Sequence, residues 1–242
     1  MNGAALVIPA WNEAAAIGAV LDEVPAGTVD RVFVVVGSAN DPTAAAARQH
    51  GATVLVPATP GYGAACWMGA QAAMDQQAEL IAFLDGDYSD PPDALPRILK
   101  PLQTGRADLV LGIRDLRQYP NALPAHARMG NSVVLWLLGR SIGQHYADLP
   151  SFKAIRSDAL RALDMCEMTY GWTVEMLTKA ARTGLRVQEI GIDYRPRLGG
   201  RSKVAGTVRG TASAAIKLVA CAIVYAAWRP RAAVQWSVVA GE

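Results

Sequence analysis

Short apolar runs alternate with amphipathic stretches along the first half of the chain. The runs that are apolar at nearly every position span residues 4–8, 32–36, 53–56, 80–84 and 109–113. Segments with helical spacing lie between them, at residues 13–24, 42–50, 63–77 and 92–104. Strands without a polar face need cover on both sides, as in a parallel sheet flanked by helices. We therefore predict an α/β fold with a mainly parallel sheet.

The pattern loosens after residue 114. The elements expected there are helices at about 126–139, 171–183 and 207–228 and a strand within 186–194. The uninterrupted apolar part of the last helix, 218–228, is too short to cross a hydrocarbon core of roughly 30 Å. We predict one large domain over residues 1–205, followed by a C-terminal amphipathic helix and tail over residues 206–242.

Composition narrows the class of protein. A chain of 242 residues with 52% hydrophobic residues can bury a large core. A formal net charge of +2, without aromatic residues interleaved among the basic ones, argues against a nucleic-acid partner. Cys66, Cys166 and Cys221 form no CxxC pair, which favours a reducing compartment. Because the first strand pattern begins within a few residues of the N-terminus, we expect no secretory signal and a cytoplasmic location.

Polar loops follow three of the predicted strands. They are Pro9–Glu13, Gly37–Asp41 and Asp85–Asp90. In open α/β sheets, ligands bind beyond the carboxyl ends of the strands. These loops should therefore meet at one cleft.

The third loop carries two carboxylates one residue apart. Asp85 and Asp87 follow an apolar strand, and alternate extended positions point the same way. Both can then reach one Mg²⁺ or Mn²⁺ ion that binds a diphosphate. A solvated acidic turn before Pro91 is the alternative, and the motif alone does not decide. For Asp90 we favour a helix cap over a place at the metal.

The order and spacing of Val7–Glu13, Gly61–Ala65 and Leu84–Asp87 resemble family 2 glycosyltransferases of the GT-A fold, a Rossmann-like α/β fold. The resemblance is closest to the polyprenyl-phosphate hexosyltransferase branch, which includes dolichyl-phosphate mannose synthase. It covers roughly residues 4–205. It implies inverting transfer of a hexose from a UDP- or GDP-linked donor to a polyprenyl phosphate, with Mg²⁺ or Mn²⁺ as cofactor.

The resemblance also implies site residues. Asp85 and Asp87 are expected to bind the metal, and Asp87 to take part in catalysis. The residues expected to bind the donor are Pro9, Asn12, Glu13, Ser38, Asp41, Gly63, Asp85, Gly86, Asp87, Arg201 and Lys203. For the first loop there is a simpler reading, in which Pro9 and Asn12 serve only helix entry, with Asn12 as the N-cap.

One departure concerns recognition of the base. Relatives carry two acids, or Asp-Asn, before Gly-Ser at the end of the second strand, where this chain has Val35-Val36. We expect Asp41, or the side chains of Ser38 and Asn40, to substitute. If mutating each leaves donor affinity unchanged, that expectation is wrong.

Basic residues follow in the second half. Arg114 and Arg128 stand where relatives carry arginines that handle acceptor or donor phosphates. The segment 199–203, with Arg201 and Lys203, resembles a late phosphate-binding loop, in which backbone amides and cations close over a diphosphate. Without the other motifs, a solvated basic loop would be the simpler reading.

The segment Asp148–Lys153 partly matches the region where relatives place an Asp and then Ser-Gly-Phe beside the sugar. Pro150 and Lys153 depart from that pattern. Asp148 is expected to bind the sugar or to act as the catalytic base, and a turn before a strand is an equal alternative. A phosphate acceptor needs no base, because it is largely dianionic at neutral pH.

Two apolar helices, around residues 132–139 and 214–228, carry aromatic residues and adjacent arginines. Such helices can lie at a membrane surface, where a lipid phosphate is presented, so we expect a peripheral contact with the inner face of the cell membrane. Packing against the sheet or in a homo-oligomer is the alternative. Two other functions stay open: transfer to a small soluble hydroxyl acceptor with Asp148 as base, and a nucleotide-binding relative without catalysis.

Overall fold

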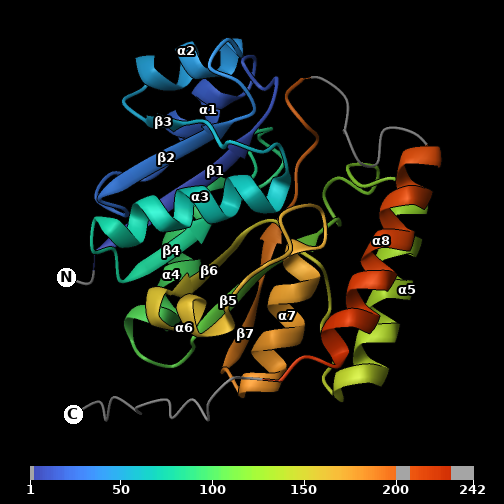
Figure 1. Ribbon diagram of the computed structural model, residues 1–242. Helices are drawn as coiled ribbons and strands as arrows, with labels where there is room; N and C mark the ends of the chain where they lie inside the picture. Colours follow the sequence, from blue (N-terminus) through green and yellow to red (C-terminus); the bar gives the residue numbers. More distant parts are fainter. Residues whose placement is uncertain (1–2, 200–207, 230–242) are drawn as a thin grey trace.

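A mostly parallel sheet forms the centre of the protein (Figure 1). The computed structural model describes residues 3–199 and 208–229. Within these residues the sheet has seven strands in the order β3-β2-β1-β4-β6-β5-β7. Only β6 runs antiparallel to its neighbours, β4 and β5, in this described sheet. The prediction of a mainly parallel α/β fold is confirmed.

The strands agree closely with the predicted apolar runs. Their bounds are β1 Ala4–Ala10, β2 Arg31–Val36, β3 Thr53–Leu55, β4 Leu80–Phe83, β5 Leu109–Asp115, β6 Lys153–Arg156 and β7 Val187–Asp193. β6 was not predicted, because it has only four residues and a basic residue at each end. Its central position in the sheet gives it the burial that a short charged sequence does not suggest.

β1 extends beyond its predicted end at Pro9. Pro9 is in register with Val35 of β2, while β4 pairs with β1 only as far as Val7. The Val7 carbonyl accepts from the N–H of Leu84, on the β4 side of the strand. The nitrogen of Pro9 points to the same side, because it lies two residues further along the strand. A proline is compatible with a strand where no N–H is needed for pairing.

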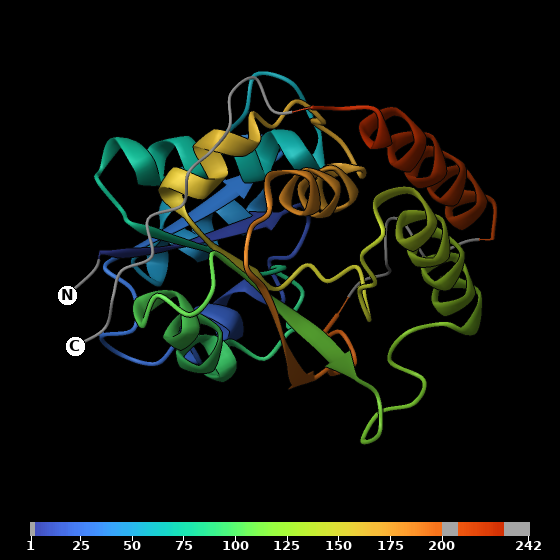
Figure 2. The same cartoon turned by 90° about the horizontal axis from the view of Figure 1, so that it is seen from below.

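Helices cover both faces of the sheet (Figure 2). Their bounds are α1 Ile17–Asp22, α2 Pro42–Gln49, α3 Tyr62–Asp75, the 3₁₀ helix η1 Pro92–Ala94, α4 Leu95–Gln103, α5 Ala125–Ile142, α6 Ser157–Leu163, α7 Trp172–Thr183 and α8 Val208–Ala226. Helices α1, α2 and α4 pack on one face, and α3, α6 and α7 on the other. Of these, α6 was not predicted.

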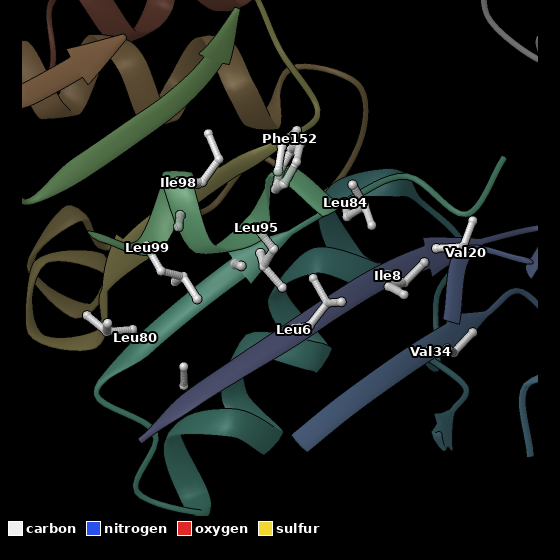
Figure 3. Packing of buried hydrophobic residues seen from close by; sticks show 14 of the residues in the cluster. Leu6, Ile8, Val20, Val34, Leu80, Leu84, Leu95, Ile98, Leu99 and Phe152 are labelled. Carbon is white, nitrogen blue, oxygen red and sulfur yellow. The ribbon is translucent and has the colours of Figure 1, made fainter. Parts of the chain in front are cut away.

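The core on the α4 face holds the strands that lead into the polar loops. Leu6 and Ile8 of β1 pack with Leu95 and Leu99 of α4 (Figure 3), and all four side chains are fully buried. Burying a side chain of this size contributes about 1.5–3 kcal/mol. The ends of β1 and β4 are therefore held on rigid elements.

Helices α5 and α8 lie side by side at one end of the molecule (Figures 1 and 2). Val134 and Leu138 of α5 pack with Val174 of α7 and with Cys221 and Ala222 of α8. No helix among the described residues is both long and apolar enough to cross a membrane. The predicted boundary at residue 205 lies outside the described residues and stays a prediction.

The predicted helix cap at Asn12 is wrong. Helix α1 begins only at Ile17, and Ala16 occupies the N-cap position without a side-chain hydrogen bond. Asn12 itself has a φ of 55°, a left-handed conformation that asparagine adopts more readily than most residues. The chain turns at Asn12 toward the end of β2 instead of entering a helix.

Candidate functional site

The first two polar loops meet at the carboxyl ends of β1 and β2. The backbone N–H of Asn12 donates to Oδ2 of Asp41 at 2.9 Å, and the N–H of Glu13 donates to the hydroxyl of Thr43 at 2.9 Å. Oδ1 of Asp41 accepts from the N–H of Thr43 at 2.9 Å and so caps α2. Asp41 thus joins the two loops. Ser38 accepts a bond from the N–H of Asn40 at 3.2 Å.

The third loop gathers three carboxylates, those of Asp85, Asp87 and Asp90. Asp87 and Asp90 are buried, and Oδ1 of Asp85 is shielded from solvent. Burial, and then the neighbouring carboxylates of Asp87 and Asp90, raise the pKa of Asp85 to about 7. Burial also raises the pKa of Asp90 to about 6. These acids crowd one place at the end of β4.

Asp87 is held from two sides. Its Oδ1 accepts from the N–H of Ser89 at 2.8 Å and from the Ser89 hydroxyl at 2.5 Å. Its Oδ2 forms an ion pair with Arg197, and the same guanidinium lies 3.6 Å from Oε1 of Glu13. Arg197 therefore connects the first loop with the third. All three predicted loops line one site, as expected.

Arg197 was not among the predicted residues. The signal was the basic loop after β7, but the prediction fell on Arg201 and Lys203, which lie outside the described residues. The backbone places Arg197 because the N–H of Leu198 donates to the Asp87 carbonyl at 3.2 Å and that of Arg195 to the Ser89 carbonyl at 2.8 Å. The beginning of this loop therefore runs along the acidic loop.

The predicted helix cap at Asp90 is wrong. Pro91 occupies the N-cap position of η1, which has no side-chain cap. The Asp90 side chain is fully buried, and its Oδ2 accepts from the hydroxyl of Ser151 at 2.7 Å. Tyr88, two residues before Asp90, has a left-handed backbone conformation with a φ of 70°. Asp90 therefore lies with the other acids of this loop, and its place at a metal stays a prediction.

The acidic group suits a hard divalent cation. Oδ1 of Asp85 and Oδ1 of Asp90 are buried and accept no hydrogen bond. Mg²⁺ and Mn²⁺ prefer such oxygen ligands. Among the described residues, no three His, Cys, Asp or Glu side chains are arranged to hold an ion by themselves. A metal here would need further ligands, and a diphosphate can supply them.

Two glycines of the predicted donor site have a steric explanation. A Cβ at Gly86 would lie 2.9 Å from the Cβ of Ala10, and one at Gly63 would lie 2.2 Å from the Glu167 carbonyl oxygen. The N–H of Gly63 donates to the Thr169 carbonyl at 3.1 Å. Close backbone contact thus accounts for both glycines without a ligand, and their predicted role at the donor stays a prediction.

Arg114, at the end of β5, and Asp148 form an ion pair. The guanidinium donates from Nη2 to Oδ1 at 2.5 Å and from Nε to Oδ2 at 2.6 Å. Both carboxylate oxygens are thus engaged, which fits a positioning role for Asp148 better than that of a free base. Asn131 of α5 lies 3.5 Å from the same carboxylate, whereas Arg128 donates to the Pro120 carbonyl at 3.4 Å.

A lysine that departs from the expected pattern is buried behind the acids. Lys153, at the start of β6, is 0% exposed. Its ammonium donates to the carbonyls of Pro150 at 2.8 Å and Ser151 at 3.0 Å, and to the hydroxyl of Thr173 at 3.1 Å. This side chain fixes the turn that carries Ser151, which in turn holds Asp90.

The sequence matches a known family. Residues 5–165 fit the family model described as Glycosyl transferase family 2. The chain is a family 2 glycosyltransferase. This glycosyltransferase is 37% identical over 209 residues to an uncharacterised glycosyltransferase of Mycobacterium tuberculosis, with 85% of this chain and 91% of the relative covered.

Another relative is the undecaprenyl-phosphate mannosyltransferase of Micrococcus luteus, which is 30% identical over 224 residues, with 85% of this chain and 89% of that protein covered. The predicted closeness of the glycosyltransferase to the polyprenyl-phosphate branch is confirmed. Among solved structures, glucosyl-3-phosphoglycerate synthase from Mycobacterium tuberculosis, in complex with Mn²⁺, UDP and glucosyl-3-phosphoglycerate, aligns with a TM-score of 0.73 and 22% identity over 93% of this chain and 80% of that one. This likeness confirms the GT-A fold.

Proposed function

We propose that this glycosyltransferase moves a hexose from a UDP- or GDP-linked donor to a polyprenyl phosphate at a membrane surface, with inversion at the anomeric carbon. The observation that carries the proposal is the group of buried carboxylates at the end of β4, with unpartnered oxygens on Asp85 and Asp90 and a guanidinium, that of Arg197, on Asp87. Such a site accepts a metal together with an anionic diphosphate.

The donor end of the reaction is assigned to the loops of β1, β2 and β4. Asp85 and Asp87 would hold Mn²⁺ or Mg²⁺, which would neutralise charge developing on the leaving diphosphate. Arg197 can turn from Asp87 to the diphosphate, since its guanidinium already lies between two loops. Support comes from glucosyl-3-phosphoglycerate synthase, which has a similar fold and whose structure contains Mn²⁺ and UDP.

The acceptor end is assigned to the side of β5 and α5. A phosphate oxygen of the acceptor would attack the anomeric carbon in line with the departing diphosphate, and it needs no base. Arg114, with Asp148 and Asn131 beside it, supplies a cation and hydrogen-bonding groups there. The name of the Micrococcus relative, a transferase to undecaprenyl phosphate, supports this acceptor.

Titration with nucleotides tests the donor assignment. We expect UDP or GDP, but not both equally, to bind in calorimetry with Mn²⁺ or Mg²⁺ present, and the heat to vanish with EDTA. The physical reason is that the buried acids repel a diphosphate unless a metal lies between them. Binding of neither nucleotide would contradict the proposal, and binding unaffected by EDTA would contradict the metal.

An exposed apolar face on α5 supports contact with a lipid surface. Met129, Val133 and Trp136 are 68%, 49% and 62% exposed and lie four and three residues apart, on one side of the helix. The helix contains Arg128 and Arg140 but no acid. Apolar side chains flanked by cations fit the headgroup region of an anionic bilayer.

Replacing Trp136 with serine should weaken binding to phosphatidylglycerol vesicles by about tenfold, since a large apolar contact is lost. Co-sedimentation measures the effect. The matched control is Val56→Ser, an exposed apolar residue just past β3, at the opposite edge of the sheet. Unchanged binding by both variants, with transfer to a water-soluble phosphorylated acceptor, would favour the soluble-acceptor alternative that glucosyl-3-phosphoglycerate synthase exemplifies in its own complex.

A further inference from the structure

Lys153 places a positive charge inside the wall of the acidic site. β6 pairs in antiparallel register with β4, so that Lys153 stands opposite Phe83, two residues before Asp85. Its three N–H groups meet three oxygen acceptors, the number that an ammonium can satisfy. None of these acceptors is an acid. Burying a charge without a direct ion-pair partner is costly, so anchoring alone does not explain a lysine here.

The nearby charges that compensate Lys153 are the carboxylates of the site. Electrostatic attraction from Lys153 lowers the pKa of Asp85 and of Asp90, against the larger effect of burial that raises both. Arg197 acts on the same group from the opening, through Asp87. Arg114 attracts Asp90 as well. Among the described residues the acids are therefore faced by three cations, of which Lys153 is the one fixed in the core.

These cations oppose a metal ion and favour a diphosphate. A free divalent cation gains from the carboxylates but is repelled by Lys153. In a metal–diphosphate complex the metal's charge is cancelled by a sugar nucleotide and outweighed by one unit by UDP or GDP, so that this repulsion is removed. We propose that Lys153 is a fixed cation that weakens binding of free Mn²⁺ or Mg²⁺ and so makes metal binding depend on the donor diphosphate. This inference rests on the proposed function. Lys153 is a positioning residue by charge and does not touch the substrate.

If Lys153 had a purely structural role, its replacement would lower the affinity for free metal instead of raising it. Lys153 holds the turn that carries Ser151, and Ser151 holds Asp90, so loosening the turn should weaken metal binding. Removal of a repelling charge should instead strengthen it. The affinity for free metal thus separates the two roles.

The experiment measures free Mn²⁺ by electron paramagnetic resonance, with the full chain alone and with saturating UDP, or GDP if that nucleotide binds. We expect Lys153→Met to bind Mn²⁺ alone about tenfold more tightly than the unaltered protein. The gain in Mn²⁺ affinity on adding nucleotide should become smaller. Lys153→Gln, whose amide keeps donors for the two carbonyls, should shift in the same direction. Thr173→Val, which removes one acceptor but no charge, is the matched control and should gain no affinity.

Circular dichroism confirms that each variant is folded. Folded Lys153 variants that bind Mn²⁺ no more tightly would overturn the inference. So would an unaltered protein that binds Mn²⁺ equally well with and without nucleotide, a result that needs no variant. If neither nucleotide binds with Mn²⁺ at all, the proposed function itself fails, which is distinguishable from a failure of Lys153 alone.

Discussion

Replacing Asp87 with asparagine should lower hexose transfer by about a thousandfold, the order seen when one preorganised charge-stabilising group is lost from a catalytic site. Oδ2 of Asp87 faces the Arg197 guanidinium and Oδ1 is fixed by Ser89, so the side chain is held in place for a metal and a diphosphate. The amide keeps the shape but loses the charge. Release of the nucleotide from the hexose donor, with Mn²⁺ and polyprenyl phosphate present, measures the effect.

The control for this variant is Asp75→Asn, which changes an exposed carboxylate at the end of α3. It should retain full activity. Transfer by Asp87→Asn within tenfold of the unaltered protein would remove Asp87 from the catalytic machinery and would leave the buried acids without the function proposed for them.

Replacing Asp85 with asparagine should stabilise the metal-free protein while it abolishes metal-dependent donor binding. Burial raises the pKa of Asp85 to about 7, so the folded protein pays for keeping this side chain ionised at pH 8. This rise in the pKa corresponds to a gain of about 2 kcal/mol in the free energy of unfolding, a value reduced because Asp85 is partly exposed. Urea denaturation in EDTA at pH 8 measures the gain.

The raised pKa of Asp85 also determines how the stability of the metal-free protein changes with pH. Because the folded pKa lies above the unfolded value near 4, the folded protein takes up the proton first as pH falls, and stability rises from about pH 8 to pH 5. In Asp85→Asn this rise should be smaller, with Asp90 responsible for the remainder. Asp75→Asn should leave the rise unchanged. If Asp85→Asn is less stable than the unaltered protein at pH 8, then the ionised Asp85 carboxylate does not destabilise the fold.

The sequence predicted those parts of the fold that have a regular pattern. The strands β1, β2, β4 and β5 lie in the predicted apolar runs. The loops after β1, β2 and β4 meet at the carboxyl ends of these strands, as a parallel sheet requires. β6 escaped prediction because a four-residue strand with Lys153 and Arg156 at its ends has no apolar pattern of its own. Its identity depends on the two strands between which it is inserted.

The candidate site was predicted unevenly for a similar reason. Asp85 and Asp87 are separated only by Gly86 and follow the same strand, so a motif reveals them. Arg197 reaches Asp87 from 110 positions away, and Lys153 acts on Asp85 and Asp90 from the neighbouring strand β6. Asp90 was misread because a helix follows it, and only the fold shows that its side chain points inward. Roles that rest on tertiary contact leave little local signal.

The place of β6 in the sheet also bears on the order in which the chain can fold. β4 and β5 have no ladder between them, since β6 pairs with both. A growing chain that has emerged only as far as residue 115 therefore has the group β3-β2-β1-β4, whose β4 edge is open, and β5 without a neighbouring strand. β5 can join β4 through β6 only after residue 156 has left the ribosome. Until then the edges of β4 and β5 are open to pairing with other chains.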